Sequence, residues 1–334
     1  MDNFITLDYG SGGKKTSALI SDMILPLLKN DALSELGDGA VIDGAERLVY
    51  STDSFVVSPY EFPGGDIGKL SVCGTVNDIS MAGGEPKYLS LAFILEEGFP
   101  TEKLQKIIDS IRLTAERAGV MVVTGDTKVV ERGRGDGIYI NTSGIGFLRT
   151  PGLSPRMIRE GDAVIVSGTV GDHGTAVMLA RNENLVQAEL KSDCAPLNEL
   201  ALKLGEKLGS GLRVMRDPTR GGLATTLNEF IEDGQLGIEI FEKDIPVDPT
   251  VNMVSEILGL DPYYSACEGR LIAVTAPERA GEAVKILQSF PEGKNAAVIG
   301  HVTKDHPGKL VIRTPMGGGR IAAKLAGAQL PRIC

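Results

Sequence analysis

Hydrophobic positions along the chain follow a helical spacing in some segments and a strand-like pattern in others. The spacing i, i+3, i+4, i+7, which places side chains on one face of a helix, occurs at residues 104–111 and again at 197–208. Continuous apolar runs predict strands at residues 47–52, 88–95, 120–124, 138–148, 163–167, 271–275, 296–301 and 310–313. Because both patterns recur in each half of the chain, we expect the α/β or α+β class.

A join rich in proline separates the two halves. Residues 150–155 read Thr-Pro-Gly-Leu-Ser-Pro, and a chain of 334 residues is long enough for two domains. We therefore predict an N-terminal domain over residues 1–150 and a C-terminal domain over 151–322. Residues 323–334 differ in kind from what precedes them and are predicted to form a mobile tail.

The charge balance makes several partner classes improbable. With 34 Lys+Arg against 44 Asp+Glu, the formal net charge is −10, which disfavours a general nucleic-acid surface. Four widely spaced cysteines without a CxxC pair indicate a reducing cytoplasm rather than a disulfide framework or a zinc site. The first residues lack the pattern of a signal peptide, and no apolar run has the roughly 18 residues of a membrane span. We therefore expect a cytoplasmic protein that binds neither nucleic acid nor membrane.

A glycine-rich segment near the start is a candidate for binding phosphate. Residues 8–16 read Asp-Tyr-Gly-Ser-Gly-Gly-Lys-Lys-Thr, which departs from the Walker pattern at Asp8 and Lys15. Glycines still allow backbone N–H groups to approach a polyphosphate closely, and Lys14 would add a positive charge. The alternative is a flexible arm that leads into a helix after Thr16.

Four acidic residues stand among small residues in the first part of the chain. They are Asp38, Asp53, Asp78 and Asp126. Carboxylates in such settings can reach a crowded centre of Mg²⁺ and phosphate, because Mg²⁺ prefers oxygen ligands that it shares with substrate phosphates. Any one of them can equally be a turn former or a helix cap.

Other polar positions leave two interpretations open. His173 is either a proton carrier or a buried, hydrogen-bonded histidine. Glu268, just before an apolar run, is either a base or a surface carboxylate. The loop at 131–137 is either a second binding loop or a hairpin. Cys334, the last residue, is either a thiol on a tether that visits an active site or part of a frayed end.

Taken together, the motifs resemble the HypE family of hydrogenase maturation factors, in the aminoimidazole ribonucleotide synthetase (PurM-like) superfamily. The resemblance extends over nearly the whole chain. The segments that carry it are residues 10–13, 77–84, 125–130, 132–137, 171–174, 217–222 and the closing Pro-Arg-Ile-Cys at 331–334. The upstream segments identify the superfamily, and the closing tetrapeptide separates HypE from its other branches.

The resemblance implies two PurM-like α/β domains, an ATP site built largely by the N-terminal domain, and a homodimer paired through N-terminal strands. It implies that a carbamoyltransferase, HypF, loads a carbamoyl group on Cys334. ATP then drives dehydration of the carbamoyl group to an S-cyanate, which passes to iron on a HypC–HypD scaffold as the cyanide ligand of [NiFe]-hydrogenase. Cys73, Cys194 and Cys267 remain packing residues.

The resemblance also implies roles for individual residues. Besides Cys334, the catalytic residues would be Lys128 and Glu268, both beside the thiocarboxamide, with Glu268 favoured as the base. Mg²⁺–ATP would be bound by Gly10, Gly12, Gly13, Lys14, Asp38, Asp53, Asn77, Asp78 and Asp126, with Asp38, Asp78 and Asp126 as the metal ligands.

Two other functions remain possible at this point. The chain could be an ATP-dependent synthetase or kinase of the same superfamily that acts on a free small molecule, in which case activity would survive loss of the tail. It could also be a non-catalytic cysteine carrier, although the acidic motifs speak against a carrier without an ATP site.

Overall fold

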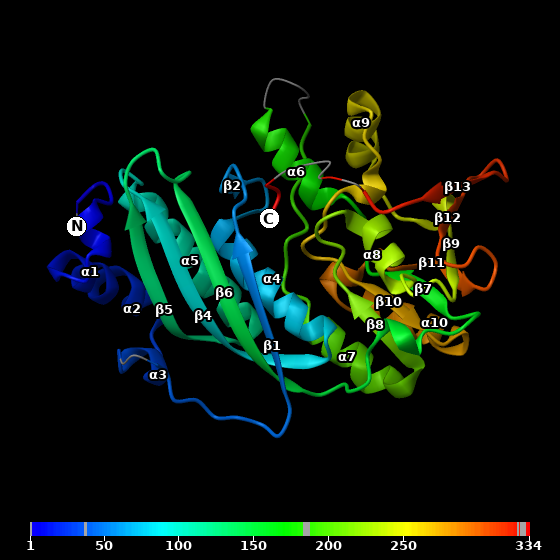
Figure 1. The fold of residues 1–334 in the computed structure, drawn as a ribbon, viewed down its shortest axis with the longest axis horizontal. Helices are drawn as coiled ribbons and strands as arrows, with labels where there is room; N and C mark the ends of the chain where they lie inside the picture. Colours follow the sequence, from blue (N-terminus) through cyan, green and yellow to red (C-terminus); the bar gives the residue numbers. More distant parts are fainter. Residues whose placement is uncertain (1, 37–38, 183–187, 326, 328–331) are drawn as a thin grey trace.

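The computed structural model describes residues 2–36, 39–182, 188–325, 327 and 332–334. Figure 1 shows two α/β units side by side, each built around its own sheet. The N-terminus lies at one end of the first unit, whereas the last residues lie between the two units, near the centre of the molecule. The predicted α/β class is confirmed.

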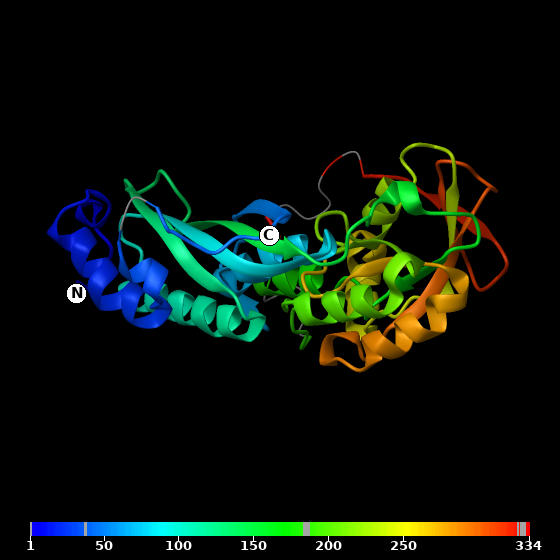
Figure 2. The ribbon, with the colours of Figure 1, turned by 90° about the horizontal axis from the view of Figure 1, so that it is seen from below.

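The first unit contains a four-stranded sheet of order β1-β6-β4-β5. Strands β4 and β5 are parallel, and the other two pairs are antiparallel. Helices α4 and α5 cover one face of the sheet (Figure 2), where alternate residues of β4 such as Leu91 and Phe93 are buried. The bounds are β1 (Leu48–Phe55), α4 (Ile67–Met81), β4 (Gly84–Glu96), α5 (Thr101–Ala118), β5 (Met121–Val130) and β6 (Ile138–Leu148).

The spacing of apolar residues explains α5. Ile107, Ile108 and Ile111 are buried against the sheet, as the helical period requires. The helix ends at Gly119, whose φ of 67° is a left-handed conformation that glycine adopts without strain. The predicted helix at 104–111 is confirmed and is longer than the pattern that indicated it.

Short elements precede and follow β1. An N-terminal arm folds over the far edge of the sheet and consists of η1 (Leu7–Gly10), α1 (Lys14–Leu19), the π-helical turn η2 (Ile20–Ile24), α2 (Leu25–Leu28) and α3 (Asp31–Ser34). Strands β2 (Glu61–Phe62) and β3 (Gly65–Asp66) form a small hairpin before α4. The Asp66 side chain accepts a hydrogen bond from the Lys69 amide and so caps α4.

The second unit contains a seven-stranded sheet of order β13-β12-β9-β11-β7-β10-β8. Its central strands β7 and β10 are buried at every position, because helices lie on both faces. The strands are β7 (Ala163–Val166), β8 (Leu212–Arg216), β9 (Gly237–Phe241), β10 (Ile272–Thr275), β11 (Ala297–Thr303), β12 (Leu310–Arg313) and β13 (Gly319–Ala322). The helices are α6 (Asp172–Arg181), α7 (Asn198–Leu208), α8 (Gly222–Phe230), α9 (Pro249–Leu258) and α10 (Ala280–Gln288).

Helices α4 and α7 join the two units. Met81 of α4 lies in the same hydrophobic cluster as Leu197, Leu200 and Leu204. The contact brings one end of α4 against the loops of the second unit, which is where the acidic residues of both halves meet. Among the helices of the described part of the chain, none is long and apolar enough to cross a membrane.

Candidate active site

The last three residues lie in a groove between the two units. The amide of Val56 donates to the carbonyl oxygen of Cys334 at 3.3 Å, and the amide of Ser58 donates to that of Arg332 at 3.2 Å. The segment therefore pairs with residues 56–58 in the manner of an added strand. Docked in this way, the chain end enters the centre of the molecule rather than solvent.

His173 holds the middle of this segment from the second unit. Its Nε2 lies 2.9 Å from the carbonyl oxygen of Ile333, and its Nδ1 lies 2.8 Å from the hydroxyl of Ser192. The ring is fully buried, and burial lowers the pKa of His173 to about 4. It is therefore neutral at pH 7, with Nε2 donating to Ile333 and Nδ1 accepting from Ser192. Of the two interpretations of His173, the buried, hydrogen-bonded one is confirmed.

The side chain of Arg332 is tied to the first unit. Its guanidinium lies 2.5 Å from a carboxylate oxygen of Asp136 and donates to the carbonyl oxygen of Val56 at 3.0 Å. From the second unit, Arg181 donates to the carbonyl oxygen of Arg332. Asp136 belongs to the loop between β5 and β6, which are separated by β4 in the sheet, so the interpretation of residues 131–137 as a hairpin is wrong. The loop crosses over the end of β4, and it also contacts the tail.

The thiol of Cys334 lies in a cavity of about 430 Å³, whose described lining includes Arg220, Asp217, Thr225 and Ile333. Arg220 approaches the sulfur at 3.8 Å. Burial, reinforced by the negative charge of Glu268, raises the pKa of the Cys334 thiol to about 12. The docked thiol is therefore protonated at pH 7 and is a poor nucleophile in this position.

Glu268 is the acidic residue whose surroundings best match those of a catalytic base. Its side chain is 1% exposed, and its Oε1 has no hydrogen-bond partner. Burial comes first among the causes that raise its pKa well above the ordinary value, followed by the charges of Asp217, Asp193 and Asp53. An unpartnered, buried carboxylate costs free energy, so such a group points to a function at this position.

The backbone around Glu268 is held rigidly by neighbours. Its amide donates to Asp193 at 3.1 Å, and the side-chain amide of Asn77 donates to its carbonyl oxygen at 3.3 Å. The Asn77 oxygen accepts from the amide of Leu197 at 2.8 Å. Asn77 is fully buried, and both ends of its amide are already occupied. Its role here is to fix the loop of Glu268 against α4, and the nucleotide contact expected for it stays a prediction.

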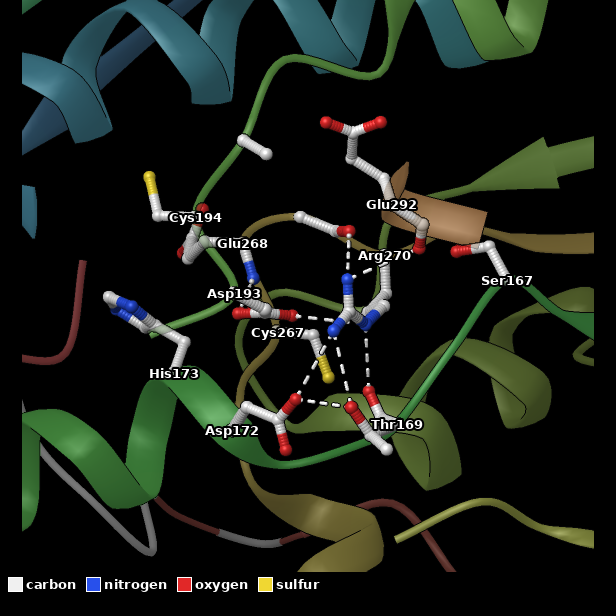
Figure 3. Close-up of polar contacts among 12 residues, drawn as sticks. Ser167, Thr169, Asp172, His173, Asp193, Cys194, Cys267, Glu268, Arg270 and Glu292 are labelled. Carbon is white, nitrogen blue, oxygen red and sulfur yellow. Dashed lines mark hydrogen bonds and ion pairs between the residues drawn. The ribbon is translucent and has the colours of Figure 1, made fainter. Parts of the chain in front are cut away.

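Arg270 anchors the same loop from behind, as Figure 3 shows. Its guanidinium donates to the carbonyl oxygen of Thr169 at 3.0 Å and lies 3.3 Å from Asp172 and 3.8 Å from Asp193. Cys267 accepts a contact from a backbone amide at 3.2 Å and is fully buried. Cys267 is thus a packing residue, as expected, and the cluster of Arg270 supports the neighbouring Glu268.

Three further carboxylates gather on the α4 side of this centre. They are Asp53 on β1, Asp78 on α4 and Asp217 after β8. Burial is the main cause that raises the pKa of each one, to about 7 for Asp217, and the charges of Asp53 and Asp78 add to the effect there. The hydroxyl of Ser51 donates to Asp78 at 2.7 Å. Carboxylates gathered in this way attract a cation, which would offset their mutual repulsion.

The expected metal ligands are not seen together. Asp38 lies outside the described residues, and Asp78 and Asp126 belong to different neighbourhoods, Asp78 beside Ser51 and Asp126 beside Lys128. Within the residues that the structure describes, no three His, Cys, Asp or Glu side chains are grouped so that they could hold a metal ion.

A second cavity, of about 690 Å³, lies between the N-terminal arm and β4–β5. Gly10, Gly12, Asp126 and Lys128 are among its lining residues. The chain at Gly10 passes so close to β5 that an added Cβ would lie 2.6 Å from the backbone nitrogen of Val129. Asp126 accepts from Lys128 at 2.7 Å, which lowers the pKa of Asp126. Gly13 and Lys14 follow at the exposed start of α1.

The structure therefore brings some of the expected residues together and separates others. Cys334 lines one cavity with Asp217 and Ala266, and the negative charges of Glu268 and Asp53 contribute to the raised pKa of its thiol. Lys128 and Cys334, in contrast, line two different cavities.

Sequence reasoning missed several residues that position the tail and the base. They are Asp136, Arg181, Ser192, Asp193, Arg220 and Arg270. Two of them had a visible signal. Asp136 stands in the loop at 131–137, and Arg220 stands in the segment Asp-Pro-Thr-Arg-Gly-Gly with Gly221 and Gly222 at φ of 81° and 60°. Two consecutive glycines in the left-handed conformation are typical of a turn where a ligand or another segment comes close to the backbone.

Comparison with known proteins agrees with this architecture. Residues 36–148 match the model of the AIR synthase related protein N-terminal domain, and residues 159–313 match that of the C-terminal domain. A carbamoyl dehydratase HypE from Bradyrhizobium diazoefficiens is 46% identical over 332 residues, which cover 99% of this chain and 96% of the relative. The chain belongs to the HypE family.

Solved structures of the family share the whole fold. The HypE of a complex with ATP superimposes with a TM-score of 0.94 at 45% identity and covers 98% of this chain and 99% of that chain. In a HypE–HypF complex the matching chain has a TM-score of 0.80 at 45% identity, and the match covers 92% of this chain and 100% of that chain. The predicted architecture of two PurM-like α/β domains is thereby confirmed.

Proposed function

We propose that this protein is an ATP-dependent carbamoyl dehydratase that acts on its own Cys334. One observation carries the proposal: Cys334 lines the same cavity as Ala266, two residues before the buried, unpartnered carboxylate of Glu268, and the charge of Glu268 acts on the Cys334 thiol. A carbamoyl group on that sulfur would place its amide nitrogen near a base with a raised pKa, as proton removal at neutral pH requires. The product would be an S-cyanate.

The described residues divide the proton chemistry among them. Glu268 would accept protons from the nitrogen, one at a time, as the carbon–oxygen bond breaks. The loop that bears Glu268 is held by Asn77 and Asp193, so the base does not need to reorganise during the reaction. Arg220, 3.8 Å from the sulfur, would stabilise negative charge that develops beside it. The neutral His173 would hold the chain end in register.

The cavity at the N-terminal arm fits ATP. Its glycines allow close approach to an anion, and Lys128 and Lys14 offer positive charge. We propose that Gly10, Gly12, Gly13, Lys14 and Asp126 hold the nucleotide, and that Asp38, Asp53, Asn77 and Asp78 complete its environment. Bound ATP would supply a phosphoryl group that makes the carbamoyl oxygen a leaving group. A solved relative at 45% identity is a complex with ATP, which supports the proposal.

Mg²⁺ also fits the residue types present. Desolvation raises the pKa values of Asp53, Asp78 and Asp217, and neighbouring negative charge adds to the effect at Asp53 and Asp217. A divalent cation near them would relieve that repulsion and would neutralise phosphate charge. We propose Asp38, Asp78 and Asp126 as the ligands, which requires the ion and the nucleotide to bridge the separate neighbourhoods of Asp78 and Asp126.

Lys128 stays a catalytic candidate, but its place of action is the nucleotide cavity rather than the cavity of Cys334. It lines the nucleotide cavity, whereas Cys334 lines the other one. We propose that Lys128 acts on the phosphoryl group of ATP, and that the two cavities communicate in the loaded protein, as transfer of this group to the carbamoyl oxygen requires.

The partners follow from the same proposal. Because the docked thiol is protonated and half-buried, its loading with carbamoyl by HypF requires the tail, proposed as residues 323–334, to leave the groove. A HypE relative forms a complex with HypF, which supports this partner. The cyanide would then pass to iron on a HypC–HypD complex in the cytoplasm.

A homodimer is proposed through the first sheet. Helices cover one face of that sheet, whereas Tyr50 and Ile94 are exposed on its strands β1 and β4. A second copy could cover these residues. The proposed domains, 1–150 and 151–322, would then each keep one sheet, with the dimer formed by the N-terminal one.

The mass of the C-terminal peptide tests the activity directly. The protein is loaded with carbamoyl by its transferase and incubated with or without Mg²⁺–ATP. Loss of one water from the peptide of Cys334, only with ATP, is the expected result. A carbamoyl adduct that persists would favour a carrier without dehydratase activity. No adduct, with an active transferase, would favour a superfamily enzyme that acts on a free small molecule.

A matched variant separates these outcomes. Cys334→Ala should bind ATP as the wild type does, yet form no cyanate. Equal product from Cys334→Ala would exclude the proposed function.

A further inference from the structure

The groove that holds residues 332–334 is built like a peptide-binding site. The carbonyl oxygen of each of the three residues accepts a hydrogen bond from the groove, from Ser58, His173 and Val56 in that order. Main-chain hydrogen bonds along an extended segment are the usual source of affinity when a peptide adds to a strand. Both units contribute donors, so the site exists only at their junction.

The groove also contacts the side chains of the docked segment. Ile333 is 6% exposed and packs into the hydrophobic core of the first unit. Arg332 pairs with Asp136 at 2.5 Å. Cys334 follows and faces the cavity that contains Arg220. The groove thus offers, in order, a carboxylate for an arginine, an apolar pocket for an isoleucine and a cavity for a thiol. It therefore fits the short sequence Arg-Ile-Cys rather than peptides in general.

These contacts are made to the three residues themselves, and none of them involves the covalent link to the rest of the chain. A tether contributes effective concentration, in the millimolar range for short flexible linkers, but no recognition of its own. A separate molecule with the same three residues at a sufficient concentration therefore meets the same groove.

We infer that this groove is a substrate site for S-carbamoyl peptides that end in Arg-Ile-Cys, and that the protein dehydrates such peptides when another molecule supplies them. The inference rests on the proposed function. In the reaction the peptide keeps its C–S bond and loses the carbamoyl oxygen, which leaves with the phosphoryl group of ATP as inorganic phosphate. The nitrogen loses two protons, so R–S–CO–NH2 and ATP give R–S–CN, ADP and phosphate, with no change of oxidation state.

The test uses the full chain with its own tail prevented from docking. In the double variant Ile333→Asp, Cys334→Ala, a carboxylate replaces the buried isoleucine, and a buried, unpaired charge is strongly disfavoured. The probe is a fluorescent Pro-Arg-Ile-Cys peptide carrying an S-carbamoyl group. We expect saturable binding, at least tenfold tighter than to wild type, whose tail competes for the groove. With Mg²⁺–ATP the peptide should lose one water by mass.

Matched controls define the specificity. A Pro-Arg-Asp-Cys probe should bind at least tenfold more weakly, and His173→Phe or Asp136→Asn in the double variant should weaken binding of the Ile probe. Binding is measured without ATP, so it tests the groove independently of turnover. Absent binding, or equal binding of both probes, would overturn the inference.

Wild-type protein loaded by its transferase is assayed in parallel. If it loses water while the bound peptide does not, the inference is overturned and the proposed function stands. If the loaded wild type loses no water, the proposed function fails. Selective peptide binding would then still support the groove as a peptide site.

Discussion

Nε2 of His173 lies 2.9 Å from the carbonyl oxygen of Ile333, and this hydrogen bond joins residues 160 positions apart in the chain. The ring is fully buried and neutral, with the hydroxyl of Ser192 on its other nitrogen. The amide of Cys194 in turn donates to that hydroxyl at 3.0 Å. The docked position of Cys334 is thus connected to residues 192–194, of which Asp193 accepts a hydrogen bond from the amide of Glu268.

Replacing His173 should release the tail. In His173→Phe the carbonyl of Ile333 loses its donor while the volume of the ring is kept. Loss of a buried hydrogen bond costs about 1–3 kcal/mol, so the docked form should become about tenfold less populated or lower. Labelling of Cys334 by a thiol reagent should accelerate by the same factor, because the other three cysteines are buried.

The conservative variant His173→Gln serves as the control. Its side-chain amide can donate from a position close to Nε2, so labelling of Cys334 should return toward the wild-type rate. Equal acceleration in both variants would mean that ring packing, and not the hydrogen bond, holds the tail.

Replacing Glu268 should stop dehydration without loss of nucleotide binding. Glu268→Gln keeps the size of the side chain but cannot accept a proton, and positioned general bases contribute about 10²–10⁴-fold to a rate. The mass assay of the Cys334 peptide should show a decrease of that size. Glu199→Gln, on the exposed side of α7, is the matched control and should leave the rate unchanged.

The pH profile provides a second test of Glu268. A base must be deprotonated to act, and its pKa is raised well above 4.5 by burial and neighbouring charge. The wild-type rate should therefore rise with pH at values above 4.5, and this acidic limb should be absent from Glu268→Gln. An unchanged limb in the variant would assign the titration to another group.

Asp217 should make the protein less stable as pH rises. Its pKa in the fold is about 7 against an ordinary value of 3.8, so between these values the folded chain binds more protons than the unfolded chain. Stability therefore falls as pH rises from about 4 to 7. At pH 8 Asp217→Asn should unfold at a higher temperature than wild type, with a free energy of unfolding larger by up to about 4 kcal/mol. Below pH 4 the two proteins should unfold at similar temperatures.

Thermal unfolding of Asp43→Asn gives the baseline for that comparison, because Asp43 is exposed in a loop. Parallel curves for wild type and Asp217→Asn across pH 4–8 would show that Asp217 is not the buried titrating group.

The strands and two of the helices could be predicted from the sequence, because their apolar residues either follow the helical spacing or form a continuous strand-like run. Residues 104–111 and 197–208 lie in α5 and α7, and each predicted apolar run lies in or overlaps a strand. Helix α4 was not predicted, and the reason is physical. Sheet, α5 and the second unit bury it on nearly all sides, so its sequence has no polar face to reveal a helical period.

The site was only partly accessible. Cys334 and Glu268 were each identified, one through its position at the end of the sequence and the other through resemblance. Their convergence was not, because it depends on a tail that adds to residues 56–58 and on Arg270 behind the base. The separation of Lys128 from Cys334 likewise depends on which side of β5 the arm covers, which no local pattern encodes.

The N-terminal arm offers the last prediction. Gly10 lies against β5, where a Cβ would meet the Val129 backbone nitrogen at 2.6 Å and its Cβ at 3.0 Å. Gly10→Ala should push the arm away from the wall of the nucleotide cavity, and overpacking of this kind costs about 1–3 kcal/mol. We expect about tenfold weaker ATP binding by calorimetry. Gly281→Ala, where a Cβ meets nothing within 4 Å, should bind ATP normally. An unchanged affinity in Gly10→Ala would place the nucleotide outside the cavity beneath the arm.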